Sequence, residues 1–384
     1  MKFIFNKIVV SVFTLFNQCT MKKYYLIAFI ILTSNQLRAQ QTVVLDSINF
    51  YGSLRAHVAV YDEQLEVQNN SSRIGFYLNR RIVSGVAGFA KLELGTNLVQ
   101  NNSTFNADAA TFPDESFYNE TQPAFTTRLG FIGLQSKYGS IAIGKQWGVY
   151  YDVSAWTDLF WIFGGKASGT YNTNTDGGTE GTGRAENSLV YRYQADRFSL
   201  GLQAQFNGDK QNYAASAIAN VTDQITLGAS FNTYAPSQDI LNLVGGSQTH
   251  ANSFVVGFRY KSDKLNLAAN YDFNQSESQF PGDTVVAFPA NGVELYANYF
   301  LLPKLSVVGG FNYLKPTSTP EIIDPDFNLF QIMIGAAYYF VPDFLAYTEY
   351  KIDLGTDTGG NKPANVFAIG LRYNFDFGKS KVKI

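Results

Sequence analysis

Five basic residues stand in otherwise apolar, strand-like segments of the sequence: Arg55, Arg73, Arg128, Lys145 and Arg184. Arg73 opens the run Arg-Ile-Gly-Phe, and Arg128 opens the run Arg-Leu-Gly-Phe. A basic residue on a strand face that contacts lipid at mid-depth costs roughly 2–4 kcal/mol. We therefore expect these side chains to face an aqueous interior, where guanidinium and ammonium groups attract anions. The alternative is a structural role, in which each arginine pairs with a neighbour to hold the fold.

The sequence lacks the residue sets that enzymatic or metal chemistry would need. His57 and His250 are the only histidines, and Cys19 is the only cysteine. No serine nucleophile motif accompanies His57, so a place on the wall of an aqueous interior is favoured over a catalytic role. Gly177-Gly178 is not followed by the Lys-Ser/Thr of a phosphate-binding loop. We predict no enzyme activity, no cofactor and no metal site.

Long alternating segments must position these basic residues. Apolar and polar residues alternate from Phe198 to Asn207, and the pattern recurs from Leu265 to Phe273 and from Phe367 to Phe377. Such segments run to about ten to twelve residues, which is typical of membrane strands and longer than the strands of soluble sandwiches. Aromatic residues gather near the ends of the apolar faces, as at Tyr338 and Phe340, and this suits a lipid interface.

A sheet in lipid must close, because an open edge would leave backbone N–H and C=O groups unpaired. The sequence therefore predicts an all-β fold, a transmembrane antiparallel β-barrel of about sixteen strands. The expected strands are 47–61, 71–79, 86–97, 125–136, 139–149, 184–194, 197–207, 212–222, 224–234, 253–261, 264–274, 292–301, 304–314, 328–340, 344–354 and 366–377.

The connections alternate between short turns and long polar loops, which is typical of outer-membrane barrels with both termini on the short-turn side. The third long loop, 150–183, also carries Trp156, Phe160, Trp161 and Phe163, which are too apolar to remain in water. We expect this loop to fold inward. The expected long loops are 62–70, 98–124, 150–183, 236–251, 277–290, 317–327 and 356–364.

Residues 1–39 are predicted to be an export leader, because they contain basic residues and no acidic residue around short apolar runs. A secretory signal pattern begins at Met21, which makes Met21 an alternative functional start. Subtracting the five basic residues of the leader from 29, against 31 acidic residues, leaves the mature chain with a net charge of −7. This charge argues against nucleic acid as a partner. We expect the barrel to occupy 40–384, with 378–384 as a short basic tail.

Several stretches of the sequence resemble the general-diffusion porins of Gram-negative outer membranes. Residues 139–152 read GSIAIGKQWGVYYD and residues 157–165 read TDLFWIFGG, similar to the strand and lumen loop of that family. Residues 127–134, TRLGFIGL, and 72–76, SRIGF, are similar to two further porin strands. The resemblance implies a homotrimer in outer-membrane lipid, with the third loop narrowing a water-filled channel.

The resemblance also implies roles on the basic side of the narrowest point. Arg73, Arg128 and Arg184 match the family's arginine cluster on the lumen wall. Lys145 matches another basic wall position. Arg55 lies two residues beyond the family's wall lysine and so keeps the same face.

On the acidic side, the resemblance implies fewer charges than the family usually carries. Asp158 matches the first acidic residue of the third loop, and Glu93 matches a further lumen carboxylate. The next two loop acids are replaced by Ile162 and Lys166. We therefore expect the transverse field between basic wall and acidic loop to be weakened on the loop side.

Together these observations predict a channel through which small hydrophilic solutes and ions diffuse, with a weak preference for anions. A second hypothesis is a substrate-specific outer-membrane channel for sugars, phosphate or nucleosides, in which Trp147, Trp156 and Trp161 would begin an aromatic ladder. A hypothesis from another class, an outer-membrane hydrolase, lacks a catalytic set. A soluble all-β binding protein would leave the strand length unexplained.

Overall fold

The computed structural model describes residues 44–99, 102–103, 105, 107, 120–121, 124–171, 181–208, 210–235, 251–279 and 286–383. Val44–Val382 form one compact unit. The expected leader, 1–39, and nearly all of the expected loop 236–251 lie outside the described residues. Within the described residues, no helix is both long enough and apolar enough to cross a membrane.

Strands dominate the described chain, with one short helix, α4 (Tyr151–Ser154). The strands are β1 (Val44–Tyr61), β2 (Gln64–Asn69), β3 (Arg73–Val83), β4 (Val86–Thr96), β5 (Asn102–Ser103), β6 (Glu120–Thr121), β7 (Phe125–Ser136), β8 (Gly139–Trp147), β9 (Arg184–Gln194), β10 (Phe198–Asn207), β11 (Lys210–Asn220), β12 (Ile225–Tyr234), β13 (Ala251–Lys261), β14 (Leu265–Gln279), β15 (Val286–Leu302), β16 (Leu305–Pro316), β17 (Leu329–Val341), β18 (Phe344–Asp353) and β19 (Val366–Lys383).

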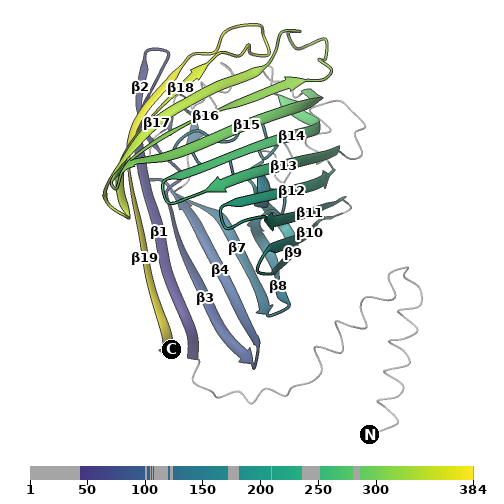
Figure 1. The fold of residues 1–384 in the computed structure, drawn as a ribbon, viewed down its shortest axis with the longest axis vertical. Coiled ribbons are helices and arrows are strands. Elements are labelled where there is room, and N and C mark those ends of the chain that lie inside the picture. Colours follow the sequence, from purple (N-terminus) through teal and green to yellow (C-terminus); the bar gives the residue numbers. More distant parts are fainter. Residues whose placement is uncertain are drawn as a thin grey trace, which may run out of the picture. The chain divides into compact units, whose positions relative to one another are not determined.

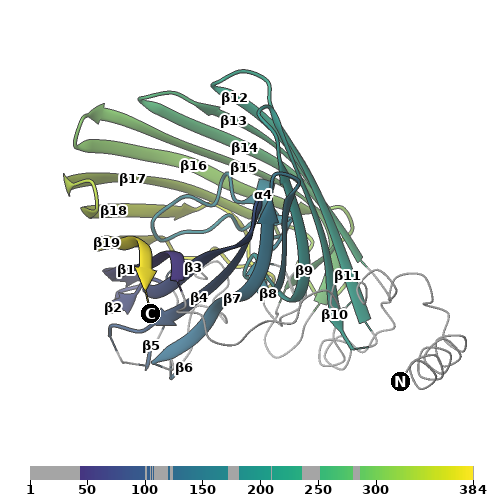
Figure 2. The ribbon, with the colours of Figure 1, turned by 90° about the horizontal axis from the view of Figure 1, so that it is seen from below.

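Seventeen of these strands form one antiparallel sheet, and β5 pairs with β6 in a separate small sheet. The large sheet closes because β1 pairs with β19, and the two strands lie side by side in Figures 1 and 2. β2 and β3 both pair with β1, one with each half of it, and so they act as a single barrel strand. The wall is therefore a closed barrel of sixteen strands, which confirms the predicted fold.

Alternation along the strands separates an apolar outer face from a more polar lumen. In β10, Leu200, Leu202 and Phe206 are 43%, 55% and 52% exposed, whereas Gln203 and Gln205 between them are buried. The outer face thus presents apolar side chains to lipid, and the polar side chains reach partners inside the barrel.

Three parts of the chain differ from the sequence-based expectation. The expected long loop 62–70 is instead a tight turn at Asp62-Glu63 followed by β2. Both turn residues have positive φ, 43° and 69°, and such turns match the twist of a β-hairpin. The expected loop 277–290 is shorter because β14 and β15 extend into it. The expected tail 378–384 is largely a continuation of β19, which runs to Lys383.

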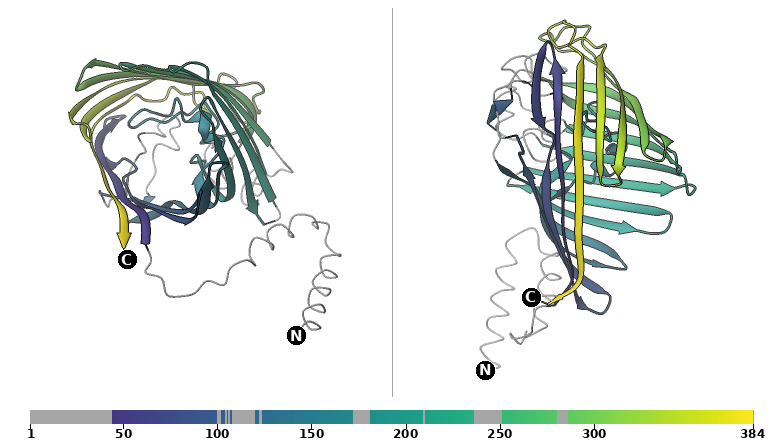
Figure 3. Two further views of the ribbon diagram at one scale, coloured as in Figure 1. Left: turned by 60° about the horizontal axis from the view of Figure 1, so that its bottom comes forward. Right: turned by 90° about the vertical axis from the view of Figure 1, so that its left-hand side faces the viewer.

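The chain between β8 and β9 leaves the wall and folds into the lumen, as its aromatic residues predicted. α4 contacts β11, β12 and β13 from inside. Trp156 packs with Val255 of β13, and Phe163 packs with Met333 of β17. In the left-hand view of Figure 3 the strands form a ring, and coloured loop segments lie within it.

Candidate functional site

Glu93 of β4 is the centre of one charged cluster on the inner wall. Its carboxylate accepts a hydrogen bond of 3.0 Å from Arg128 Nε and one of 2.9 Å from the Tyr51 hydroxyl, and it lies 4.0 Å from Arg73 Nη1. Glu93 is only 5% exposed, so its charge is compensated by these partners rather than by bulk water. Three of the predicted site residues, Arg73, Glu93 and Arg128, are thus in direct contact; below we call them, with Tyr51, the Glu93 cluster.

A β-bulge turns Arg128 into this cluster. Strict alternation would place Arg128 with Ile132 and Leu134, which are 62% and 46% exposed on the outer face. The pairing of β4 with β7 shifts between Glu93 and Leu94, so that Arg128 is left without a partner across the ladder. An extra residue in one strand re-aims its side chain. The inward position of Arg128 therefore comes from the bulge and not from the alternation.

Arg55 belongs to a second inner-wall group that the sequence analysis identified only in part. Its Nε donates to Ser53 Oγ at 2.7 Å, and the Ser53 hydroxyl lies 2.7 Å from Asn374 Oδ1 of β19. Asn374 Oδ1 also accepts from Arg372 Nε at 2.9 Å. Arg372 alternates with the outward Leu371 and Tyr373, so the sequence pattern already indicates that its side chain faces the lumen. The stretches that resemble porins end well before β19, so the resemblance implied no role for Arg372.

Lys145 forms its ion pair with Glu186 of β9 and not with the Glu93 cluster. The pairing of β8 with β9 shifts at this residue, between Gly144 and Gln146, and Gly144 has a φ of +131°. A bulge re-aims side chains, so the exposed Ile141 and Ile143 earlier in β8 do not fix the side on which Lys145 lies. Trp147, two residues further along the strand, stacks on Tyr151 of the third loop. The lumen position of Lys145 therefore stays a prediction.

Aromatic rings connect Arg184 to the third loop. The Arg184 guanidinium lies 5.5 Å from the centre of the Trp147 ring, which stacks on the Tyr151 ring at 4.7 Å. The Tyr151 hydroxyl donates to Asp158 at 2.6 Å. Burial, and then the Asp158 charge, raises the pKa of the Tyr151 hydroxyl well above its usual range, so this donor stays protonated.

Asp158 is satisfied mainly within its own loop. Besides Tyr151, it accepts hydrogen bonds from the Tyr171 hydroxyl at 2.6 Å and from the Gly165 N–H at 3.1 Å. Lys166 lies with its ammonium 5.1 Å from the centre of the Tyr171 ring. Asp158 and Lys166, two predicted site residues, therefore share Tyr171 as a neighbour.

The tip of the loop is held by a carboxylate that the sequence analysis missed. Glu349 of β18 accepts the N–H groups of Trp161 and Ile162, both at 2.8 Å, and it is 1% exposed. The Ile162 side chain packs beside Tyr347 and Ala337. Ile162 thus occupies an apolar contact with the wall. The sequence around Glu349 shows only a polar residue in an alternating strand, so it does not indicate that this glutamate binds the loop.

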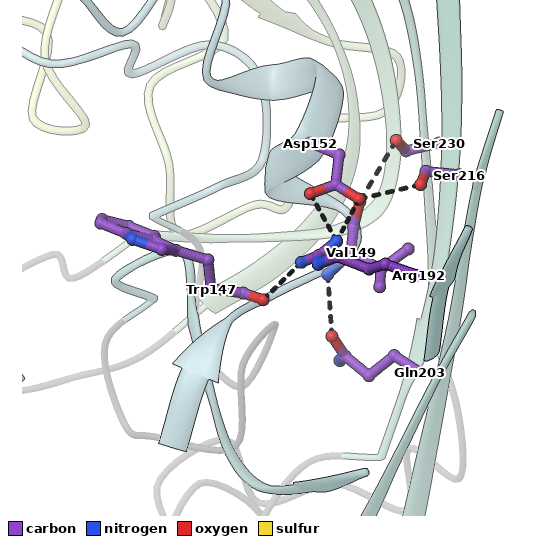
Figure 4. A network of polar contacts seen from close by, with 7 residues as sticks. All are labelled: Trp147, Val149, Asp152, Arg192, Gln203, Ser216 and Ser230. Atoms are coloured by element: carbon purple, nitrogen blue, oxygen red, sulfur yellow. Dashed lines mark hydrogen bonds and ion pairs between the residues drawn. The ribbon is translucent and has the colours of Figure 1, made fainter. Parts of the chain in front are cut away.

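The start of the loop is fixed by Arg192 of β9 (Figure 4). Arg192 Nη1 donates to both carboxylate oxygens of Asp152, at 2.8 and 2.5 Å, and Nη2 donates to the Trp147 carbonyl at 2.8 Å. Ser216 also donates to Asp152 at 2.9 Å. Burial raises the pKa of the Asp152 carboxyl, and the Arg192 charge opposes that rise. These contacts hold α4 against the wall.

The three tryptophans have separate surroundings. Trp147 stacks on Tyr151, Trp161 stacks on Tyr347 at 5.9 Å, and Trp156 is 5% exposed within an apolar cluster at the wall. These separate contacts give no support to a continuous aromatic ladder. Among the residues that the structure describes, no group of three or more His, Cys, Asp or Glu side chains could hold a metal ion.

Sequence comparison decides the family. A family model of Gram-negative porins matches residues 27–381. The chain belongs to the Gram-negative porin family. The porin is 30% identical to outer membrane porin F of Xenorhabdus nematophila over 285 residues, which cover 65% of this chain and 74% of that protein. The family places the porin in the outer membrane, as the sequence predicted.

Solved structures share the fold of this porin. Salmonella typhi OmpF, in complex with daunomycin, has a TM-score of 0.68 at 21% identity, over 85% of this chain and 97% of that one. The trimer form of Vibrio cholerae OmpT has a TM-score of 0.62 at 17% identity, over 85% of this chain and 99% of that one. The family and these relatives point to a channel and not to an enzyme.

Proposed function

We propose that this porin forms a water-filled channel through which small hydrophilic solutes and ions diffuse, with a weak preference for anions. The narrowest part would lie between the third loop and the inner arginines. The observation that carries the proposal is the charge balance there. Arg55, Arg73, Arg128 and Arg372 lie on neighbouring strands, and Glu93 is the only carboxylate within ion-pair distance of any of them among the described residues.

The acidic residues of the third loop add little to oppose these arginines. Asp158 accepts hydrogen bonds from two tyrosines and from Gly165, and Asp152 is paired with Arg192. Ile162, at a position where the resembling porins carry an acid, packs against the wall. In a narrow passage the local charges act within a Debye length of about 8 Å at physiological ionic strength. The local excess of positive charge should therefore outweigh the net negative charge of the whole chain.

The test is the reversal potential of the purified porin in a planar bilayer under a potassium chloride gradient. We expect a reversal potential with the sign that an anion-preferring channel gives. Arg73→Gln removes one positive charge and should move this potential toward zero. Lys304→Gln, at an exposed turn outside the lumen, serves as the control and should leave the potential unchanged. A cation-selective wild type would contradict the anion preference. Swelling of proteoliposomes in small sugars tests the diffusion of uncharged solutes.

We further propose that the porin assembles as a homotrimer. The trimer form of the OmpT structure supports this at the level of fold.

A further inference from the structure

The inner faces of β1 and β19 carry a continuous relay of hydrogen bonds. Arg55 Nε donates to Ser53 Oγ at 2.7 Å, Ser53 Oγ donates to Asn374 Oδ1 at 2.7 Å, and Arg372 Nε donates to the same Oδ1 at 2.9 Å. Every donor and acceptor in the relay has its match. The relay fixes both guanidinium groups through Nε and leaves their Nη atoms unused by it.

The relay also brings the two arginines close together. β1 and β19 pair in the closed sheet, and Ser53 contacts Asn374 across that pairing. All other pairs of the barrel are antiparallel and the strand number is even, so β1 and β19 are antiparallel as well. Arg55, two residues after Ser53, and Arg372, two residues before Asn374, therefore lie close together on the inner face of the wall. Like charges close together across a strand pair are destabilising unless an opposite charge lies nearby.

Among the described residues, no carboxylate supplies that opposite charge. Within the part of the chain that the structure describes, neither Arg55 nor Arg372 lies in an ion pair with Asp or Glu. Glu93, the carboxylate of the neighbouring cluster, is already held by Arg128 and Tyr51. The two guanidinium groups are also only partly exposed, so water alone compensates their repulsion incompletely.

The arginine pair lies next to the tip of the third loop. Tyr347 of β18 lies over Gly370, where a Cβ atom would come within 2.6 Å of the tyrosine hydroxyl oxygen. Gly370 is two residues from Arg372 on the same face of β19. Tyr347 stacks on Trp161 of the loop and is hydrogen-bonded by Asn70 at 2.8 Å. A solute that passes the tip therefore passes the arginine pair.

We propose that Arg55 and Arg372 form a binding site for an oxyanion, occupied transiently by anions in transit. The inference rests on the proposed channel function and goes beyond a general preference for anions. Guanidinium groups bind two oxygens of a carboxylate or phosphate in parallel hydrogen bonds, which a spherical chloride ion does not reproduce. The site therefore selects phosphate and small carboxylates over chloride.

The test measures single-channel chloride current while inorganic phosphate is added at constant pH and ionic strength. We expect phosphate to reduce the chloride current with a saturable dependence on concentration. A second series with acetate distinguishes the two sources of the oxyanion: block by both assigns a general oxyanion site, and block by one alone assigns that one. A current that falls linearly, without saturation, in both series would overturn the site.

Three variants separate a fixed site from bulk charge. Arg372→Lys keeps the charge but loses the paired N–H donors, and it should raise the half-blocking concentration by about tenfold. Asn374→Ala keeps every charge and removes only the acceptor that orients Arg372, and it should weaken the block in the same direction. Arg259→Lys is the matched control, because Arg259 faces Trp156 on another part of the wall, 4.9 Å from its ring.

The outcomes for the site and for the channel are distinct. Equal weakening of the block in Arg259→Lys and Arg372→Lys would assign the effect to general charge and overturn the site. An anion-preferring reversal potential without saturable block would also overturn the site while leaving the proposed function intact. A cation-selective wild type would contradict the proposed function itself. Unheated gel mobility of each variant confirms that the barrel has folded before its currents are compared.

Discussion

Glu93 compensates two arginines at once. Its carboxylate accepts from Arg128 and lies within ion-pair distance of Arg73, and Tyr51 donates the third contact. The four side chains come from β1, β3, β4 and β7, so one acid connects four neighbouring strands. The Glu93 cluster therefore combines the two roles that the sequence left open, a structural one and an electrostatic one.

We predict that Glu93→Gln increases the preference for anions. The substitution keeps the side-chain size and removes the negative charge that compensates Arg73 and Arg128, which should change the anion-to-cation permeability ratio by about twofold or more. Reversal potentials under a potassium chloride gradient measure this ratio. Glu321→Gln, in an exposed loop, is the control and should have no effect. A ratio that stays the same in Glu93→Gln would place the cluster away from the path of the ions.

For two basic residues, Arg128 and Lys145, the side of the wall had to be predicted from the sequence. The cost of a charge in lipid favours an inward Arg128, and the contact of Arg128 with Glu93 agrees with this. The alternation with Ile132 pointed outward, and the bulge could not be read from the sequence. The same reasoning predicts a lumen position for Lys145, where the ladder is also irregular and Glu186 is the ion-pair partner.

At the scale of elements, β8 depends on a glycine next to Lys145. Gly144 has a φ of +131°, and a Cβ atom there would lie 2.2 Å from the Gly130 carbonyl oxygen of β7. Register shifts between Gly144 and Gln146 accompany this conformation. Only glycine adopts it without strain.

Gly144→Ala should therefore destabilise the barrel, by about 1–3 kcal/mol for the backbone strain alone and more for the clash. The temperature at which unheated, compact protein converts to the unfolded form on detergent gels measures the effect. Gly309→Ala is a matched control in β16, where the added Cβ would meet only the Met333 carbonyl oxygen at 3.7 Å. Equal melting temperatures for Gly144→Ala and wild type would contradict the requirement for glycine.

The third loop was the element most completely predicted from sequence, and its anchors were not. The loop was predicted to be buried because it contains Trp156, Phe160 and Phe163, whose large apolar side chains avoid water. The residues that hold it, Glu349 and Arg192, lie in β18 and β9, and alternation assigns them only to the polar face. The tight turn at Asp62-Glu63 was missed for a related reason, since neither residue is the glycine or asparagine that usually marks positive φ.

Deletion of 158–165 should raise single-channel conductance and admit larger sugars. The deleted segment includes Trp161 and Ile162, which reach across the lumen to Glu349. Glu349→Gln is a milder variant, because it keeps the loop at full length. It weakens the two charge-assisted hydrogen bonds that hold the loop, each worth about 1.5–3 kcal/mol. The loop should then move more, and the fluctuations of the single-channel current should increase. Unchanged conductance and unchanged sugar size in the deletion would mean that this loop does not limit the passage.

At the scale of the whole molecule, the sixteen-stranded barrel followed from alternation, strand length and the need to close a sheet in lipid. What the sequence did not indicate is which part of the outer face would meet another subunit of the proposed trimer. The outer face is apolar where the strands alternate, as at Ile141 and Ile143 of β8, which are 44% and 59% exposed. Lipid and a neighbouring barrel can both cover such a face, so alternation alone does not distinguish them.

We predict that the purified porin is a trimer and that heating separates the subunits before the barrels unfold. Each barrel closes on itself through β1 and β19, so no subunit needs a strand from its neighbour. Native mass spectrometry in detergent, after incubation over a temperature series, measures the trimer directly. A wild type that is monomeric at all temperatures would contradict the trimer, and unfolded monomers as the first product of heating would contradict the independent stability of the subunits.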